Sequence, residues 1–199
     1  MTEVAENSKT PKTKKSIAAK EKIYRTSINM ISQKGFQETK IKDICREANV
    51  SVGTFYSYFN TKEDVIKELY LTADNFFFKN VAKEIENKSF EDKLNIFTHY
   101  YAKLNVETGI DMLRVLYSPD NEWFAQTRPM QQVLVKIISD AINEKIIRED
   151  FAMADVTQFI FVALRGVCYD WCINKGSFDM EERMSKYLKM VLRGLAVQG

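Results

Sequence analysis

The stretch "NVSVGTFYSYFNTKEDV", residues 49–65, carries four aromatic side chains within five positions, set among small polar residues. In a helix, residues four apart share a face, so we expect Phe55 and Phe59 to pack together into a core. The same geometry leaves Tyr56 on the exposed side, and Gly53 has no side chain to keep another molecule at a distance. The stretch therefore predicts a short helix with a buried aromatic face and an exposed polar face.

Helices on either side of this stretch complete a larger unit. Apolar residues at helical spacing predict one helix that ends at Gly35, a second that ends at Ala48, and the short third helix over 52–58. Asn49 tolerates the left-handed backbone that the turn before the third helix needs. Two short helices joined by a tight turn, with a helix packed on either side, form a helix-turn-helix unit. The candidate N-caps are Ser16, Thr39, Ser51 and Thr61, the last with Asp64 in a pattern close to a capping box.

Positive charge is concentrated near the N-terminus. Residues 8–46 hold eleven Lys or Arg against three acids, whereas residues 71–199 hold sixteen against eighteen. Residues 1–15 are polar and include four lysines, and we interpret them as a flexible basic arm. A charge run of this kind is often only a solubilising tail, but a basic end also attracts nucleic-acid phosphates through counterion release.

Beyond residue 75 the pattern is helical throughout, with no strand alternation and no internal repeat. The last helix places its apolar residues on one face between Met180 and Leu195, and Gly109 and Gly176 mark helix ends. An all-α fold follows from this pattern. The helices are expected near 64–86, 90–107, 109–117, 121–148, 152–175 and 179–197.

Several classes of protein are disfavoured by the sequence. No run of about 18 apolar residues marks a transmembrane helix, and the polar N-terminus is not a signal peptide. Three cysteines are too few for a disulfide framework, so a reducing cytoplasm is the simplest compartment. We find no nucleophile–base pair, no Gly-rich phosphate loop and no cluster of metal ligands. We therefore expect a cytoplasmic protein that is not an enzyme and has no cofactor, metal site or membrane partner.

The run "GFQETKIKDICREANVSVGTFYSYFNTKEDVIKEL", residues 35–69, resembles the DNA-binding domain of the TetR family of transcriptional regulators. The spacing from Thr39 through Tyr56 to Lys62 makes the match specific. The matching positions are Gly35, Phe36, Thr39, Ile44, Ala48, Val50, Ser51, Gly53, Tyr56, Phe59, Lys62, Glu63 and Leu69. Three positions depart from the family pattern: Cys45, Asn49 and Tyr58, where Ala, Gly and His are common.

The resemblance implies an N-terminal three-helix helix-turn-helix DNA-binding domain over 17–77, with its motif at 40–59, followed by a larger helical ligand-binding and dimerisation domain over 78–199. It implies a homodimer, joined through the last two helices, on a near-palindromic double-stranded operator, with a small-molecule effector in the larger domain. The residues implied to bind DNA are Thr39, Lys40, Ser51, Val52, Gly53, Thr54, Tyr56, Ser57, Tyr58 and Lys62.

Aromatic residues are concentrated in the larger domain, where seventeen of the 24 lie beyond residue 70. Most must form the core or a dimer interface, but some can line a pocket for an apolar or aromatic ligand. Arg114 and Arg165 lie in apolar helices and need a partner, either a ligand anion or, as is more common, the nearby Asp111 and Asp170. The candidate ligand-binding residues are His99, Tyr100, Arg114, Trp123, Phe124, Arg165 and Tyr169.

The segment "VTQFIFVALRGVCYDWC", residues 156–172, is apolar on nearly every side. A monomer of this size does not easily cover such a helix, so together with the last helix it predicts a four-helix dimer interface, where Gly166 allows close approach. Cys168 and Cys172 share one face of this helix. Because their neighbours are apolar, we interpret them as small hydrophobes in preference to a redox pair or a soft-metal site.

These observations predict a ligand-responsive transcriptional repressor that a small, apolar or aromatic effector releases from its operator. An activator, or a regulator of the same fold without a small ligand, stays open because the sequence does not give the sign of regulation. A helical enzyme or binding protein with an incidental basic end is the third hypothesis. It predicts no salt-dependent binding to duplex DNA, whereas the first two predict such binding.

Overall fold

The computed structural model describes residues 14–117 and 128–196, and within these ranges it contains helices and no strand. The all-α prediction is confirmed. The arm predicted over 1–15 lies almost wholly outside the described residues, as do the candidate ligand residues Trp123 and Phe124.

The chain divides into two compact units, residues 1–68 and 69–199. The division falls inside helix α4 (Glu63–Phe76), which continues from one unit into the other. The resemblance implied a boundary at residue 77, just past the end of this helix.

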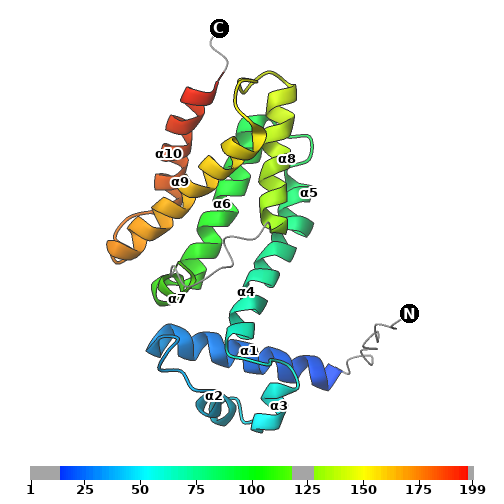
Figure 1. Ribbon diagram of the computed structural model, residues 1–199, viewed down its shortest axis with the longest axis vertical. Coiled ribbons are helices and arrows are strands. Elements are labelled where there is room, and N and C mark those ends of the chain that lie inside the picture. The colour runs from blue at the N-terminus through cyan, green and yellow to red at the C-terminus, as the bar shows by residue number, and fades with distance from the viewer. Residues whose placement is uncertain (1–13, 118–127, 197–199) are drawn as a thin grey trace, which may run out of the picture. The chain divides into compact units, whose positions relative to one another are not determined.

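The N-terminal unit contains α1 (Lys14–Lys34), α2 (Ile41–Glu47), α3 (Val52–Tyr56) and the first turns of α4. Helix α2 packs on both α1 and α3 (Figure 1). Phe55 and Phe59 are buried, as predicted, with ring centroids 5.7 Å apart. The core of this unit consists of Ile23, Met30, Ile44, Cys45, Ala48, Phe55, Phe59 and Val65.

The turn between α2 and α3 follows the predicted chemistry. Asn49 adopts a left-handed backbone with φ of 50°, and the Val50 N–H donates to the Cys45 carbonyl at 2.9 Å. This bond closes the end of α2 in the manner of a Schellman motif. The Ser51 hydroxyl then accepts the Thr54 N–H at 3.0 Å, which caps α3 as expected.

The capping box before α4 is also present. The Thr61 hydroxyl accepts the Asp64 N–H at 3.2 Å, and the Asp64 carboxylate accepts the Thr61 N–H at 3.1 Å. By contrast, the predicted cap at Thr39 is wrong. The N-cap of α2 is Lys40, while the Thr39 side chain is 1% exposed and its hydroxyl donates to the Gly35 carbonyl at 2.8 Å. The Thr39 hydroxyl therefore bonds to the turn that precedes α2 and does not cap that helix.

The helical domain begins with the rest of α4, a π-helical segment η1 (Phe77–Val81) and the short α5 (Ala82–Glu84). The sequence predicted this region as one continuous helix. The remaining helices are α6 (Phe90–Thr108), α7 (Ile110–Leu116), α8 (Pro129–Asn143), α9 (Met153–Ile173) and α10 (Met180–Leu195). Helix α9 packs on α7, α8 and α10, and α6 packs on α8 and α10 (Figure 1).

Helix α8 differs from the helix predicted over 121–148. It begins at Pro129, because Arg128 has an extended backbone and proline suits the first helical position. It ends at Asn143, and Lys145 then takes a left-handed conformation with φ of 58°. The apolar residues after 143 belong to the returning turn and not to another helical turn.

Helix α9 is, among the described residues, the helix long and apolar enough to cross a membrane by length and composition. Polar residues such as Gln158 and Arg165 interrupt its apolar run, so the sequence did not indicate it as a transmembrane helix. Nine of its residues are buried within the helical domain, as is typical of the core helix of a globular protein.

Candidate nucleic-acid interface and interior cavity

Helix α3 has one side buried in the core of the N-terminal unit and one side exposed to solvent. Phe55 is fully buried, whereas its neighbour Tyr56 is 50% exposed and Val52 is 40% exposed. Gly53 is also exposed, and a Cβ added there would meet only the Ser51 hydroxyl oxygen, at an ordinary contact distance of 3.7 Å. The buried phenylalanine thus fixes the helix on the core, and the residues beside it are presented to solvent.

Hydroxyl groups surround this exposed face. The Ser51 and Thr54 hydroxyls lie 2.8 Å apart, and the Ser57 hydroxyl donates to the Thr54 carbonyl at 2.7 Å. Hydroxyl groups can both donate and accept, and Tyr rings contact thymine methyls and sugars, so this set suits base edges and phosphates. Lys40, at the N-cap of α2, is exposed and adds a cation on the same unit.

Three of the residues implied to bind DNA have side chains that are engaged inside the protein: Thr39, whose hydroxyl bonds to Gly35, and Tyr58 and Lys62. The Tyr58 hydroxyl donates to the Ser16 hydroxyl at 3.1 Å. The Lys62 ammonium donates to the carbonyls of Phe36 and Thr39, the latter at 2.9 Å, and lies 4.1 Å from the centroid of the Phe36 ring. Burial lowers the pKa of Lys62. The Lys62 contacts connect the loop before α2 to the start of α4, whereas the Tyr58 contact joins the segment after α3 to α1.

The candidate ligand residues in the described part of the helical domain do not form one site. His99 contacts Glu181 at 2.9 Å on the surface, and the Tyr100 hydroxyl donates to Glu84 at 2.7 Å. Arg114 is exposed and pairs with Asp111 at 3.4 Å, as the intramolecular alternative predicted, and Tyr169 is 59% exposed. Of the five that the structure describes, only Arg165 lines an interior cavity.

This interior cavity has a volume of about 20 Å³, enough for one water molecule. Arg165 does not pair with Asp170: its Nε donates to the Phe161 carbonyl at 3.2 Å, while Asp170 contacts Arg183 at 3.4 Å. The cavity is lined by Tyr101, Arg128, Met130, Gln131, Phe161 and Arg165.

A buried ion pair adjoins the cavity. Arg128 Nε donates to the Asp74 carboxylate at 3.0 Å, and the side chains are 9% and 5% exposed. The guanidinium lies 4.3 Å from the centroid of the Tyr70 ring, and the Met130 N–H donates to the other Asp74 oxygen at 3.3 Å. Sequence reasoning missed both charged residues. The sequence did mark the position of Arg128, because this residue directly precedes the proline that begins α8.

Polar groups continue from the cavity into the core. The Tyr101 and Tyr117 hydroxyls lie 3.3 Å apart, and Tyr117 also donates to the Asn105 side chain at 3.2 Å. Burial raises the pKa of both tyrosines, and it raises the pKa of the Cys168 thiol to about 12. Cys172 is also buried with a raised pKa, so both thiols are neutral and behave as core residues. Among the described residues no group of three or more metal-ligating side chains occurs.

Helix α9 also presents an apolar stripe to solvent. Phe159, Val162, Tyr169 and Ile173 are 53%, 52%, 59% and 59% exposed, and Gly166 lies among them with open space around it. Their spacing of three and four residues places all five on one face of the helix. On α10, Tyr187 and Met190 are 40% and 63% exposed. Large exposed apolar patches mark surfaces that bind other molecules.

Known proteins resemble part of the N-terminal unit in sequence and most of the chain in fold. Residues 23–69 match the family "Bacterial regulatory proteins, tetR family". The fatty acid metabolism regulator protein of Bacillus subtilis is 19% identical over 87% of this chain and 93% of its own length. The probable acrEF/envCD operon repressor of Escherichia coli K12 is 21% identical over 89% of this chain and 86% of its own.

Two solved structures have the same fold. The transcriptional regulator FadR of Bacillus subtilis, in complex with stearoyl-CoA, gives a TM-score of 0.75 at 20% identity and covers 88% of this chain and 98% of its own. The fatty acid degradation regulator FadR of Bacillus halodurans gives 0.74 at 20% identity, over 90% and 97%. With the geometry of α2 and α3, these matches define a helix-turn-helix regulator. Residues 23–69 match the DNA-binding region of the TetR family, and the chain is a DNA-binding transcriptional regulator.

Proposed function

We propose that this protein is a cytoplasmic, homodimeric repressor that a small apolar effector releases from a near-palindromic operator. The observation that carries the proposal is the face of α3, where Val52, Gly53 and Tyr56 are exposed beside the fully buried Phe55. Such a face fits the major groove, and two copies would enter successive grooves about 34–36 Å apart. The base-edge and phosphate contacts come from Lys40, Ser51, Val52, Gly53, Thr54, Tyr56 and Ser57.

We further propose that the dimer forms through the apolar stripe of α9 with the exposed face of α10. The stripe has heptad-like spacing, and Gly166 at its centre allows two helices to approach closely. Burial of four large apolar side chains that are each more than half exposed supplies a driving force for association.

The effector is proposed to be a long-chain acyl-CoA or a related apolar chain with an anionic head. Support comes from the similar fold of the FadR structure that holds stearoyl-CoA. In this chain the aromatic rings of Tyr101 and Phe161 lie beside Arg128 and Arg165 around the interior cavity, which offers an apolar wall with cations. A cavity of about 20 Å³ must open to admit such a ligand, so the effector would favour an open conformer whose α3 helices no longer match successive grooves.

The test is a mobility shift with DNA upstream of the protein's own gene, at two salt concentrations, with and without an added long-chain acyl-CoA. We expect a discrete protein–DNA complex that is weakened by salt and dissociated by the acyl-CoA. Tyr56→Ala should reduce operator affinity by at least tenfold while the dimer persists in sedimentation. Phe78→Ala, which removes a ring that is 57% exposed in the helical domain, is the matched control and should bind normally. Normal operator binding by Tyr56→Ala would refute the role assigned to α3.

A regulator of the same fold without a small ligand is the second candidate. The small volume of the interior cavity favours it, because about 20 Å³ holds no more than a water molecule. This candidate predicts the same operator complex but no response to acyl-CoA. Tighter binding on addition of acyl-CoA would instead identify a ligand-dependent co-repressor mechanism.

A further inference from the structure

A second, larger hollow lies in the helical domain. It is a groove of about 410 Å³, bounded by the start of α6, the turn after α8 and one face of α10. Sites for small molecules typically measure about 300–1,000 Å³. None of its lining residues lines the interior cavity. Its apolar wall consists of Phe90, Leu94, Ile146, Ile147, Leu188 and Leu192.

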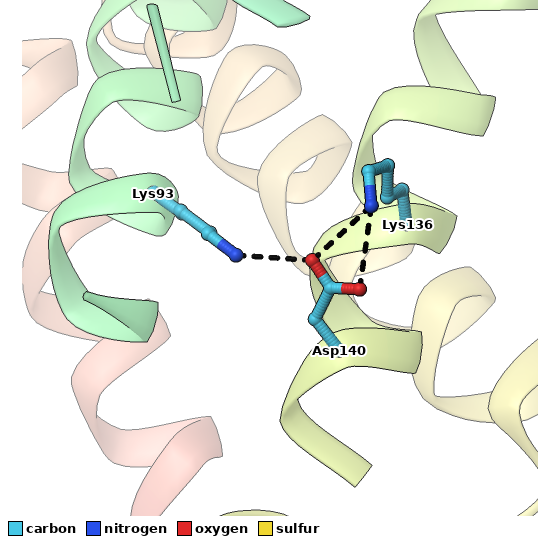
Figure 2. Close-up of polar contacts among 3 residues, drawn as sticks. All are labelled: Lys93, Lys136 and Asp140. Atoms are coloured by element: carbon cyan, nitrogen blue, oxygen red, sulfur yellow. Dashed lines mark hydrogen bonds and ion pairs between the residues drawn. The ribbon is translucent and has the colours of Figure 1, made fainter. Parts of the chain in front are cut away.

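The walls of this groove are held together by contacts between elements far apart in the chain. The Arg148 N–H donates to the Leu195 carbonyl at 3.0 Å, which ties the turn after α8 to the end of α10. On the other side, Lys93 of α6 contacts Asp140 of α8 at 3.0 Å (Figure 2). A groove that exists before its ligand arrives loses less ordering entropy on binding.

The rim of the groove is cationic. Lys189 and Arg193 lie four residues apart on α10, and both are exposed. Neither makes an ion pair or a side-chain hydrogen bond within the described part of the chain, whereas Arg183 of the same helix contacts Asp170. Among the lining residues the single acid is Glu91, so the charges of the groove sum to a positive value. An anionic group would therefore complement this rim.

The groove and the proposed dimer face use different residues of α10. Successive residues of a helix are about 100° apart, so Met190, which is 63% exposed and does not line the groove, lies to one side of Lys189 and beside Arg193. Tyr187 lies on the same side as Met190, whereas Ser185, Lys189 and Leu192 line the groove. The proposed dimer face and the groove therefore have no residue in common on α10.

We propose that this groove is a second ligand site and that it binds an unbranched aliphatic carboxylate. The chain lies on the apolar wall, and the carboxylate pairs with Lys189 and Arg193 at the rim. The site lies in the helical domain and shares no lining residue with the interior cavity. It gives the protein a means of sensing a free carboxylate apart from any ligand of the cavity.

The test is calorimetric titration of the full-length protein with decanoate, octanoate and decylammonium. We expect decanoate to bind about fifteenfold more tightly than octanoate, because it has two more CH₂ groups and each buried CH₂ contributes a factor of about four. Decylammonium should bind at least tenfold more weakly than decanoate. The double variant Lys189→Glu/Arg193→Glu should lose at least tenfold in decanoate affinity. Lys79→Glu/Lys83→Glu reverses two exposed lysines at the same spacing elsewhere and should leave this affinity unchanged.

Two further variants distinguish binding in the groove from binding in the interior cavity. Ser185→Trp fills the groove and should abolish decanoate binding, whereas Arg165→Met alters the interior cavity and should not change it. The proposal is overturned if the wild type does not bind decanoate, if both double variants bind it equally, or if binding is lost only with Arg165→Met. It is also overturned if Lys189→Glu/Arg193→Glu converts the dimer to a monomer in sedimentation, because the groove would then be an interface between copies of the chain.

Discussion

The N-terminal unit and the helical domain distribute polar groups in opposite ways. In the N-terminal unit the rings of Phe55 and Phe59 are buried, while the hydroxyls of Ser51, Tyr56 and Ser57 remain at the surface. In the helical domain the hydroxyl of Tyr101 and the ion pair of Asp74 with Arg128 are buried, and whole apolar side chains such as Tyr169 and Ile173 are exposed. The difference indicates that the N-terminal unit presents hydroxyl groups for polar contacts, whereas the helical domain also buries polar groups and exposes apolar side chains that can serve association.

The largest expected effect tests the buried ion pair. Arg128→Met leaves the Asp74 carboxylate buried without its cation, so we expect the free energy of unfolding to fall by about 3–5 kcal/mol. The measurement is urea unfolding followed by circular dichroism. Because an apolar replacement of both partners removes the unpaired charge, Asp74→Leu/Arg128→Met should recover most of this loss. A loss below about 1 kcal/mol for the single variant would show that water reaches the pair.

This pair also shows why sequence patterns predicted two helix caps of the N-terminal unit and missed the buried ion pair of the helical domain. The caps at Ser51 and Thr61 depend on residues three positions away, so the local sequence predicts them. Asp74 and Arg128 are 54 positions apart, and no local pattern relates a carboxylate on α4 to a guanidinium before α8.

The prediction of a helix cap from local sequence also failed at Thr39, where the hydroxyl had more than one possible backbone partner. The Thr39 hydroxyl had two turns within reach, and it bonds to the Gly35 carbonyl in place of capping α2. Aromatic content predicted an apolar interior correctly, but it does not specify which rings meet. Hence His99 and Tyr100 lie at the surface with carboxylate partners, and only Arg165 reaches the cavity.

The second prediction separates a positioning residue from a phosphate contact in the N-terminal unit. Lys62→Met removes two charge-assisted hydrogen bonds to the carbonyls of Phe36 and Thr39, so we expect a loss of about 1–2 kcal/mol in unfolding free energy. Operator affinity should fall, because the loop before α2 is no longer held to α4. The slope of log affinity against log salt should stay unchanged, since a residue that releases no counterion does not contribute to it.

Lys40→Met is the matched control for that measurement. Lys40 is exposed and makes no side-chain cap, so its loss should leave unfolding unaffected. As a proposed phosphate contact, it should reduce the salt slope by about 1. If Lys62→Met also reduced the slope by this amount, the intramolecular role assigned to Lys62 would be wrong, and its ammonium would turn to DNA on binding.

The smallest expected effect belongs to the ion pair that fixes α6 on α8. The hydrogen bond from Lys93 holds the pKa of Asp140 below its usual value of 3.8, with smaller contributions from Lys136 (Figure 2). A carboxyl whose pKa is depressed in the folded state stabilises that state above the unfolded pKa and loses this contribution as pH falls through the folded pKa. Because Asp140 is 30% exposed, solvent screening limits the gain to about 1 kcal/mol or less.

Asp140→Asn should therefore lower the unfolding free energy by this amount at pH 7 and by progressively less below about pH 4, with both curves measured by urea unfolding. Glu144→Gln, at an exposed carboxyl just past the end of α8, should leave the unfolding free energy at pH 7 unchanged. The same Asp140 variant also bears on the groove, because Lys93 lies on the turn of α6 that carries Glu91 and Leu94. If the pair only fixes the wall, decanoate affinity should fall by no more than a few-fold, whereas the loss for the rim variant at Lys189 and Arg193 should be at least tenfold. Equal losses would mean that the position of α6, and not the charge of the rim, determines binding.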